Sequence, residues 1–213
     1  MPDFKWIINE SKLPWLKLDI KIPHEEMLKE AISLKDEFVS HRDHDSDPRS
    51  GYRHKGWRSL CIHGISPTHT NHFVQYGFKS HKTTPYKWTE ICDRCPVTAD
   101  FFKNKFPYKT YYRLRFMLLE PQGFITPHKD GDINKLSPIN IALNHPKNCL
   151  MKMKGHKGYV PFQPGDSMLL DVGNEHAYIN RSDEDRYHII VHGIAAPEYV
   201  DLVEKSYEKN GTQ

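Results

Sequence analysis

Two histidines and one aspartate in the C-terminal half of the chain have the residue types and spacing of a metal site. His128 and Asp130 are two residues apart at the predicted end of a strand, so both side chains point to one side and can chelate one ion. His176 follows after a run of short apolar strands. Two imidazoles and one carboxylate form the facial set that holds non-haem Fe(II) and leaves positions open for a co-substrate and O2. Arg186, ten residues beyond His176, adds a cation that can grip an acidic co-substrate.

A His-x-Asp pair is weak evidence by itself, because the chain contains 14 histidines. A second pair, His41 and Asp43, is followed by His44 and Asp45 in the polar stretch 41–56. A solvated, charged loop is the favoured interpretation of this stretch, because no later histidine is paired to it by a strand framework. A mobile lid is the alternative for a loop of this length.

The composition indicates one globular domain. Of the 213 residues, 38% are apolar and 12% aromatic, which is enough for a core. The net charge of +3, with both signs interspersed, argues against a nucleic-acid partner. No apolar run resembles a signal peptide or a membrane span, and four cysteines are too few for a disulfide scaffold. We therefore expect a cytoplasmic protein without a membrane partner.

The N-terminal half contains few clear periodic segments. Alternating apolar residues predict strands over 16–22 and 57–62, and apolar residues at helical spacing predict a helix over 24–40. Cys92 and Cys95 lack the second ligand pair that a structural zinc needs, so we interpret them as ordinary thiols at the start of a helix over 96–105.

The C-terminal half contains short apolar segments separated by turn residues every eight to twelve positions, the spacing of an antiparallel sandwich or barrel. A turn is predicted at 121–123 and a short helix over 197–207. The expected strands are 139–143, 150–153, 159–162, 168–170 and 187–191.

The side-chain pattern of the segment 110–119 predicts a further strand with two different faces. Leu114, Phe116 and Leu118 share one face, and Arg113 and Arg115 lie on the other. On an outer face the arginines are plain surface residues. Inside a barrel, Arg115 would be a buried cation awaiting a carboxylate, because unpaired buried charge is costly. The pattern leaves both alternatives open.

The segments PHKDGD (127–132) and PGDSMLLDVGNEHAYINRSDEDRYHIIVHG (164–193) resemble the Fe(II)- and 2-oxoglutarate-dependent oxygenases. The resemblance is to the aspartyl/asparaginyl β-hydroxylase group, which includes cis-proline hydroxylases, and it covers residues 113–193. It implies a mainly β protein with flanking helices, folded as a double-stranded β-helix (jelly roll, cupin-like). The whole chain, 1–213, is then one oxygenase domain, with an N-terminal region 1–109, a core 110–195 and a tail 196–213.

The resemblance also implies roles for individual residues. Fe(II) would be bound by the His128, Asp130 and His176 set, and O2 would be consumed there. Arg186 would bind the co-substrate by pairing with the distal carboxylate of 2-oxoglutarate, and Asn140 and His188 would lie near the co-substrate. Arg115 would bind the substrate carboxylate. The implied reaction hydroxylates a small substrate, a free amino acid or a peptide residue, and releases succinate and CO2.

Two positions depart from the group's pattern. Many relatives carry an arginine where this chain has Ser137 and Pro138. They often carry a small or hydroxylic residue at the position of His188. The larger His188 side chain would either narrow the co-substrate pocket or add a hydrogen bond. Asp130 supplies a carboxylate that the animal aspartyl hydroxylases lack, which favours the bacterial free-amino-acid branch. The alternative function is that of a non-oxygenase, metal-binding cupin. Arg186 distinguishes the two functions, because such a cupin has no need of an arginine at this position.

Overall fold

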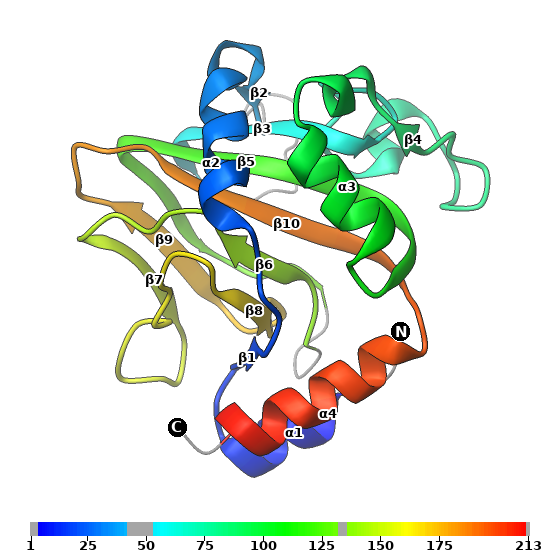
Figure 1. Ribbon diagram of the computed structural model, residues 1–213. Coiled ribbons are helices and arrows are strands. Elements are labelled where there is room, and N and C mark those ends of the chain that lie inside the picture. The colour runs from blue at the N-terminus through cyan, green and yellow to red at the C-terminus, as the bar shows by residue number, and fades with distance from the viewer. Residues whose placement is uncertain (1–3, 42–52, 132–135, 212–213) are drawn as a thin grey trace.

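The computed structural model describes residues 4–41, 53–131 and 136–211. Four α-helices flank strands that account for most of the regular structure (Figure 1). The helices are α1 (Lys5–Ser11), α2 (His24–Ser33), α3 (Pro96–Asn104) and α4 (Glu198–Asn210), with short 3-10 turns at Lys35–Glu37, Phe73–Tyr76 and Glu90–Asp93. The strands are β1 (Trp15–Leu18), β2 (Val39–Ser40), β3 (His54–Gly64), β4 (Lys87–Trp88), β5 (Tyr108–His128), β6 (Ile139–Ala142), β7 (Cys149–Met153), β8 (Ser167–Leu170), β9 (His176–Asn180) and β10 (Arg186–Ala195).

Strand β5 joins two layers of antiparallel strands. Its first part pairs with β10 and β3 in a large layer ordered β1-β8-β6-β10-β5-β3-β2. Its last part pairs with β9, which pairs in turn with β7. Figure 1 shows β7 and β9 set apart from the larger layer that carries α2 and α3. The mainly β, double-stranded β-helix fold expected from the sequence is confirmed.

A bulge lets β5 pass from one layer to the other. Gln122 has a φ of 58°, and the register of β5 against β3 shifts between Lys55 and Trp57. A Cβ at Gly123 would lie 2.7 Å from the carbonyl oxygen of Glu120, so only glycine fits here without a shift of the backbone. The turn expected at 121–123 is instead a bulge inside one long strand, because β5 pairs with β3 on both sides of it, at Leu119 and at Phe124.

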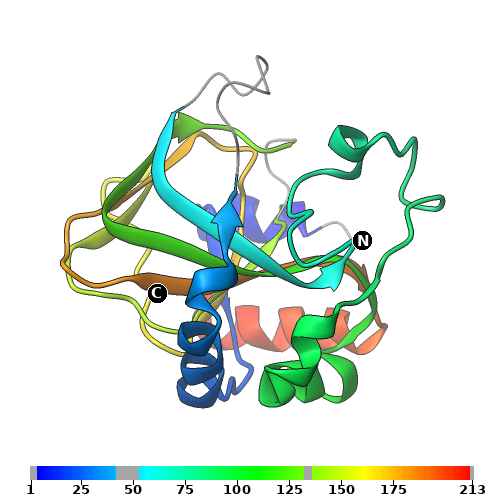
Figure 2. The ribbon, with the colours of Figure 1, turned by 90° about the horizontal axis from the view of Figure 1, so that it is seen from above.

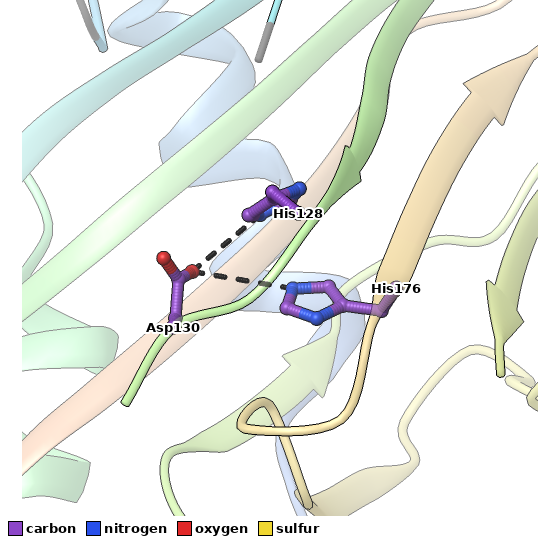
Figure 3. Close-up of side chains that lie close together, drawn as sticks. All are labelled: His128, Asp130 and His176. Carbon is purple, nitrogen blue, oxygen red and sulfur yellow. Dashed lines mark ion pairs between the residues drawn. The ribbon is translucent and has the colours of Figure 1, made fainter. Parts of the chain in front are cut away.

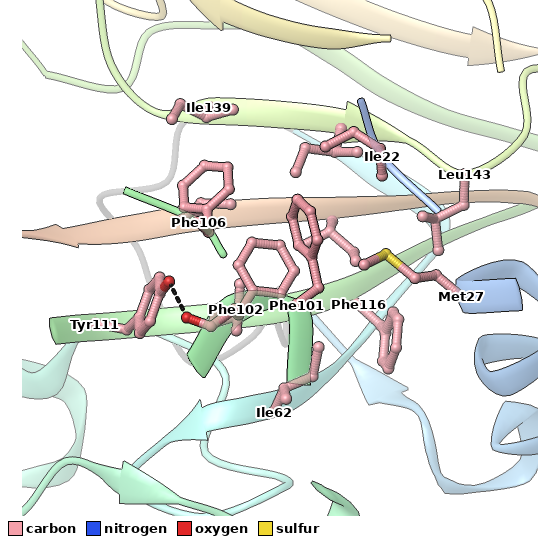
Figure 4. Packing of buried hydrophobic residues seen from close by; sticks show 14 of the residues in the cluster. Ile22, Met27, Ile62, Phe101, Phe102, Phe106, Tyr111, Phe116, Ile139 and Leu143 are labelled. Carbon is pink, nitrogen blue, oxygen red and sulfur yellow. Dashed lines mark hydrogen bonds between the residues drawn. The ribbon is translucent and has the colours of Figure 1, made fainter. Parts of the chain in front are cut away.

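The larger apolar core lies between the large layer and the helices. Figure 2 shows α2, α3 and α4 together on one side of the long strands. The predicted face of Leu114, Phe116 and Leu118 is fully buried in this core, together with Met27 of α2 and Phe102 of α3 (Figure 4). Burial of such side chains is worth about 1.5–3 kcal/mol each. The helices thus hold β5 by one face and leave its other face to the barrel interior.

A second, smaller core fills part of the space between the two layers. Met117 and Leu119, from the opposite face of β5, pack there with Met151 of β7 and Tyr178 of β9. Since β5 buries both faces, its inward residues Arg113 and Arg115 lie on the same side as Met117, inside the barrel.

Several boundaries differ from the expected ones. The strand expected over 16–22 ends at Leu18, and the helix expected over 24–40 ends at Ser33, because Val39–Ser40 pairs with β3 instead. No strand forms over 159–162, where Val160 donates a single backbone hydrogen bond to Met151. The helix after Cys95 ends at Asn104, and the tail helix runs to Asn210.

All four cysteines are buried free thiols, as the sequence indicates. Burial raises the pKa of the Cys92 and Cys95 thiols, which keeps them protonated and unreactive. In the described part of the chain, no helix has both the length and the apolar composition that a membrane crossing requires. Of the second His-x-Asp pair, Asp43 lies outside the described residues, as do His44 and Asp45.

Candidate metal centre and co-substrate pocket

Two strand ends and the residues after β5 bring the predicted metal ligands together. His128 is the last residue of β5 and lies opposite His176, the first residue of β9. The backbone N–H of Asp130 donates to the carbonyl of Val172 at 2.7 Å, which fixes the segment after β5. An oxygen of Asp130 is then 3.5 Å from Nε2 of His128 and 4.0 Å from Nε2 of His176 (Figure 3). One ligand atom from each of the three residues lies within 4.8 Å of the others.

The two imidazoles are oriented by their other nitrogen. Nδ1 of His128 lies 2.9 Å from the carbonyl of Thr126, and Nδ1 of His176 lies 3.0 Å from that of Asn174. Donation from Nδ1 to these carbonyls leaves each Nε2 with a lone pair directed at the centre, as metal-binding histidines require. Burial, and next the neighbouring His128, lower the pKa of His176, which keeps it neutral.

The donor set fits Fe(II). Two imidazole nitrogens and one carboxylate oxygen lie within 4.8 Å of one another, and these are the donor types of the facial set typical of non-haem iron. The histidines are buried, whereas the Asp130 side chain is 44% exposed, so the centre is open on its aspartate side. This openness is what a co-substrate and O2 need.

A cavity of about 640 Å³ opens next to the centre. It is lined by all three candidate ligands and by three arginines, Arg113, Arg115 and Arg186. Cavities of about 300–1,000 Å³ are the usual size for small-molecule sites. The volume accommodates a five-carbon dicarboxylate and a second small molecule together.

Arg186 is held rigidly at the wall of this cavity. It is 2% exposed, and its guanidinium lies 4.9 Å from the centre of the Tyr178 ring. One terminal nitrogen lies 2.7 Å from Nδ1 of His188, and its Nε has no hydrogen-bond partner among the described residues. A buried guanidinium whose contacts with the described residues are all neutral is suited to receive a carboxylate in a fork-like pair.

His188 lies behind the cavity wall instead of among its lining residues. It is fully buried, and its Nδ1 is also 2.7 Å from the amide oxygen of Asn140, which does line the cavity. Burial, and next the charge of Arg186, lower the pKa of His188 well below its usual value, so the ring is neutral. A neutral Nδ1 either accepts from Arg186 or donates to Asn140, but not both at once.

Arg115 lies inside the barrel, which resolves the alternative left open by the sequence. It is 3% exposed, and one terminal nitrogen donates to the carbonyl of Thr70 at 2.7 Å and lies 3.4 Å from Nε2 of His41. Its Nε is buried without a hydrogen-bond partner among the described residues. Burial, and next the charge of Arg113, lower the pKa of Arg115 to about 9, which still leaves it protonated at neutral pH.

The cavity also includes residues that the sequence did not single out. Tyr178 is two residues after His176 on the same strand face, and this spacing could have identified it. His192 similarly continues the face of Arg186 on β10. Asn71 and His72 come from a loop without periodicity, and no sequence signal points to them.

The fold and the donor set define a class of protein. A double-stranded β-helix with a two-histidine, one-carboxylate centre and an arginine in the same cavity is the architecture of the Fe(II)- and 2-oxoglutarate-dependent oxygenases. Residues 23–195 match the family model described as aspartyl/asparaginyl beta-hydroxylase. This span is most of the chain, and the protein therefore belongs to the aspartyl/asparaginyl β-hydroxylase family. It is a 2-oxoglutarate-dependent hydroxylase, and its family uses Fe(II) and 2-oxoglutarate.

Solved structures with a similar fold are distant in sequence. A prolyl-4-hydroxylase from Pseudomonas putida has 13% identity and a TM-score of 0.46, covering 89% of this chain and 98% of that one. The viral collagen prolyl hydroxylase of Paramecium Bursaria Chlorella virus-1 has 12% identity and a TM-score of 0.41, covering 84% and 95%. The non-haem α-ketoglutarate-dependent epimerase SnoN, from nogalamycin biosynthesis, has 13% identity and a TM-score of 0.46, covering 88% and 79%. No curated protein matches the chain.

Proposed function

We propose that the chain is one oxygenase domain that hydroxylates a small substrate, a free amino acid or a peptide residue, and releases succinate and CO2. In this proposal His128, Asp130 and His176 hold Fe(II), and Arg186 binds the distal carboxylate of 2-oxoglutarate. The observation that carries the proposal is the convergence of the three ligand atoms within 4.8 Å, beside a cavity that Arg186 also lines. Bound iron supplies the activation of O2.

The protein's own residues orient the reactants. The carbonyls of Thr126 and Asn174 fix the two imidazoles, so that each Nε2 would be ready to hold the metal. Arg186, stacked on Tyr178, fixes one end of the co-substrate. Asn140, on β6, presents its amide to the same part of the cavity, and its nitrogen lies 3.4 Å from the Tyr178 hydroxyl.

The substrate would bind in the part of the cavity that Arg115 lines. Arg115 lies opposite Ile190 on β10, four residues along that strand from Arg186, and is assigned to the substrate carboxylate. The apolar side chains of Met117, Ile125 and Leu170 line the space between the charged groups. They exclude water around the reacting carbon, which strengthens every charged contact made there.

The test is an anaerobic titration of Fe(II)-loaded protein with 2-oxoglutarate. We expect the weak visible charge-transfer band of an oxoacid bound to iron through two oxygens. The band should be absent in His176→Ala, and it should require far more co-substrate in Arg186→Ala, because the distal carboxylate loses its partner. The exposed His69→Ala and Arg94→Ala variants are matched controls and should behave as wild type.

The outcome that overturns the proposal is the absence of a band in freshly loaded wild-type protein. The metal-binding cupin function would then stand, with Arg186 as a structural residue. A band that survives unchanged in Arg186→Ala would keep the enzyme class but remove the assignment of this arginine.

A further inference from the structure

Tyr178 contacts both groups between which the co-substrate would lie. It is two residues after His176 on β9, and the centres of the two rings are 6.1 Å apart with their planes at 86°. The guanidinium of Arg186 lies 4.9 Å from the centre of the same Tyr178 ring. All three side chains line the cavity. A molecule that spans the metal centre and Arg186 would therefore pass beside the tyrosine.

The Tyr178 hydroxyl has a proton to donate. The amide nitrogen of Asn140 donates to the hydroxyl oxygen at 3.4 Å, and this contact uses only a lone pair of that oxygen. Among residues 4–41, 53–131 and 136–211, the hydroxyl has no second hydrogen-bond partner. Burial raises the pKa of Tyr178 to about 12, so the O–H is retained at neutral pH.

A carboxylate bound to Arg186 needs more donors than the guanidinium supplies. Arg186 is 2% exposed, so an anion that pairs with it loses its own hydration. The two oxygens of a carboxylate offer about four lone-pair positions, and a fork-like pair with arginine satisfies about two of them. A buried ion pair is stable only when further hydrogen bonds satisfy the remaining positions. The Tyr178 hydroxyl belongs to a ring that already contacts Arg186, and it is a neutral donor of the kind required.

We propose that Tyr178 binds the co-substrate, with its hydroxyl donating to the distal carboxylate that Arg186 holds. This inference rests on the function proposed above, which assigns Arg186 to 2-oxoglutarate. One charged donor and one neutral donor together select an oxoacid that carries a second carboxylate. Asn140 is a positioning residue, because a hydroxyl oxygen that accepts from its amide must direct its own proton elsewhere.

The test compares two 2-oxoacids that differ only in the distal group. 2-Oxoglutarate carries the second carboxylate, and 2-oxopentanoate has the same carbon chain with a methyl group at that end. The charge-transfer band of Fe(II)-loaded protein, titrated anaerobically, gives the Kd of each without turnover. Tyr178→Phe keeps the ring and removes only the hydroxyl. We expect it to weaken binding of 2-oxoglutarate about tenfold or more and to leave 2-oxopentanoate within about twofold, because only the first has a carboxylate for the hydroxyl.

The Arg186→Ala background separates a direct contact from an effect through the arginine. A hydroxyl that donates to the carboxylate still contributes when the guanidinium is absent, so Tyr178→Phe should weaken binding of 2-oxoglutarate again in that background. A tyrosine that only orients Arg186 would have nothing left to act on. This comparison decides the proposal if 2-oxopentanoate binds too weakly to measure. Tyr207→Phe, which removes a hydroxyl that donates to Glu10 outside the cavity, is the matched control and should behave as wild type.

Unchanged binding of 2-oxoglutarate to Tyr178→Phe overturns the proposal. Equal weakening of both oxoacids also overturns it, as does an effect that vanishes in the Arg186→Ala background. The band of the wild-type complex distinguishes the two levels of assignment. If the band forms and Tyr178→Phe binds normally, only the role of the tyrosine is wrong. If no band forms in wild type, the function proposed above fails first.

Discussion

Arg186 and His188 lie on one face of β10, and a terminal nitrogen of Arg186 is 2.7 Å from Nδ1 of His188. The other nitrogen of the same ring is 3.5 Å from Nδ1 of His145. Arg186 is thus supported from behind by a neutral, fully buried ring that does not itself line the cavity. The sequence allowed two roles for His188, to narrow the co-substrate pocket or to add a hydrogen bond. The contacts of His188 favour the added hydrogen bond.

His188→Phe keeps the ring but removes the nitrogen that contacts Arg186. We expect the KM for 2-oxoglutarate to rise about tenfold and kcat to change less, because a hydrogen bond to a charged group is worth about 1.5–3 kcal/mol and this contact acts on binding. Steady-state succinate formation measures both constants. His145→Phe is the matched control, with only the longer contact to the ring. An unchanged KM in His188→Phe would show that Tyr178 alone positions Arg186.

Asp130→Ala should remove metal-dependent stabilisation without unfolding the protein. The side chain is 44% exposed, so its loss costs the apo fold little, but the proposed metal site loses one of its three candidate ligands. A metal at about 100 times its Kd stabilises the folded state by about 2.7 kcal/mol. We expect Fe(II) to raise the Tm of wild type and not of Asp130→Ala in an anaerobic thermal scan. Glu175→Ala, also an acidic residue near His176, is the control. Equal shifts in all three proteins would contradict the metal assignment.

Acid should destabilise the protein partly through His63, which is not among the residues that line the cavity. Burial lowers the pKa of His63 from 6.5 to about 4, so the unfolded chain binds this proton at a higher pH than the folded chain. Stability is therefore complete above about pH 6.5 and is lost as the pH falls toward 4. We expect a loss of about 1–2 kcal/mol from this group by pH 5.

His63→Phe should reduce that loss, because the ring packs edge-on against Trp88 and phenylalanine can keep this contact. Urea unfolding at pH 7 and pH 5 measures the difference, with the exposed His69→Phe as control. If His63→Phe and wild type lose equal stability over this range, His63 is not the group responsible.

Periodicity predicted the strands that hold the site, and spacing singled out the three residues whose candidate ligand atoms converge. The alternation of 110–119 placed Leu114 and Arg115 on opposite faces, as the structure has them. The turn predicted from Pro-Gln-Gly at 121–123 is a bulge instead, because Leu119 and Phe124 on either side of it pair with Trp57 and Lys55 and continue the strand. Asn71 and His72 could not be predicted, because their place in the cavity depends on how a loop without repeating pattern folds over β5.

Arg115→Ala should uncouple the enzyme. Arg115 lies in the cavity with the candidate metal ligands, and its described hydrogen-bond contacts are with Thr70 and His41 instead of Arg186. Loss of the guanidinium should therefore weaken substrate-stimulated turnover, by about tenfold or more, and should weaken the slower decay of 2-oxoglutarate without substrate to a lesser degree. Parallel assays of CO2 release, with and without the best substrate from a panel of small carboxylates, measure the two rates. Arg94→Ala, an exposed arginine, controls for the loss of charge. If both rates fall equally, Arg115 supports the fold or the co-substrate, and the substrate carboxylate must bind elsewhere in the cavity.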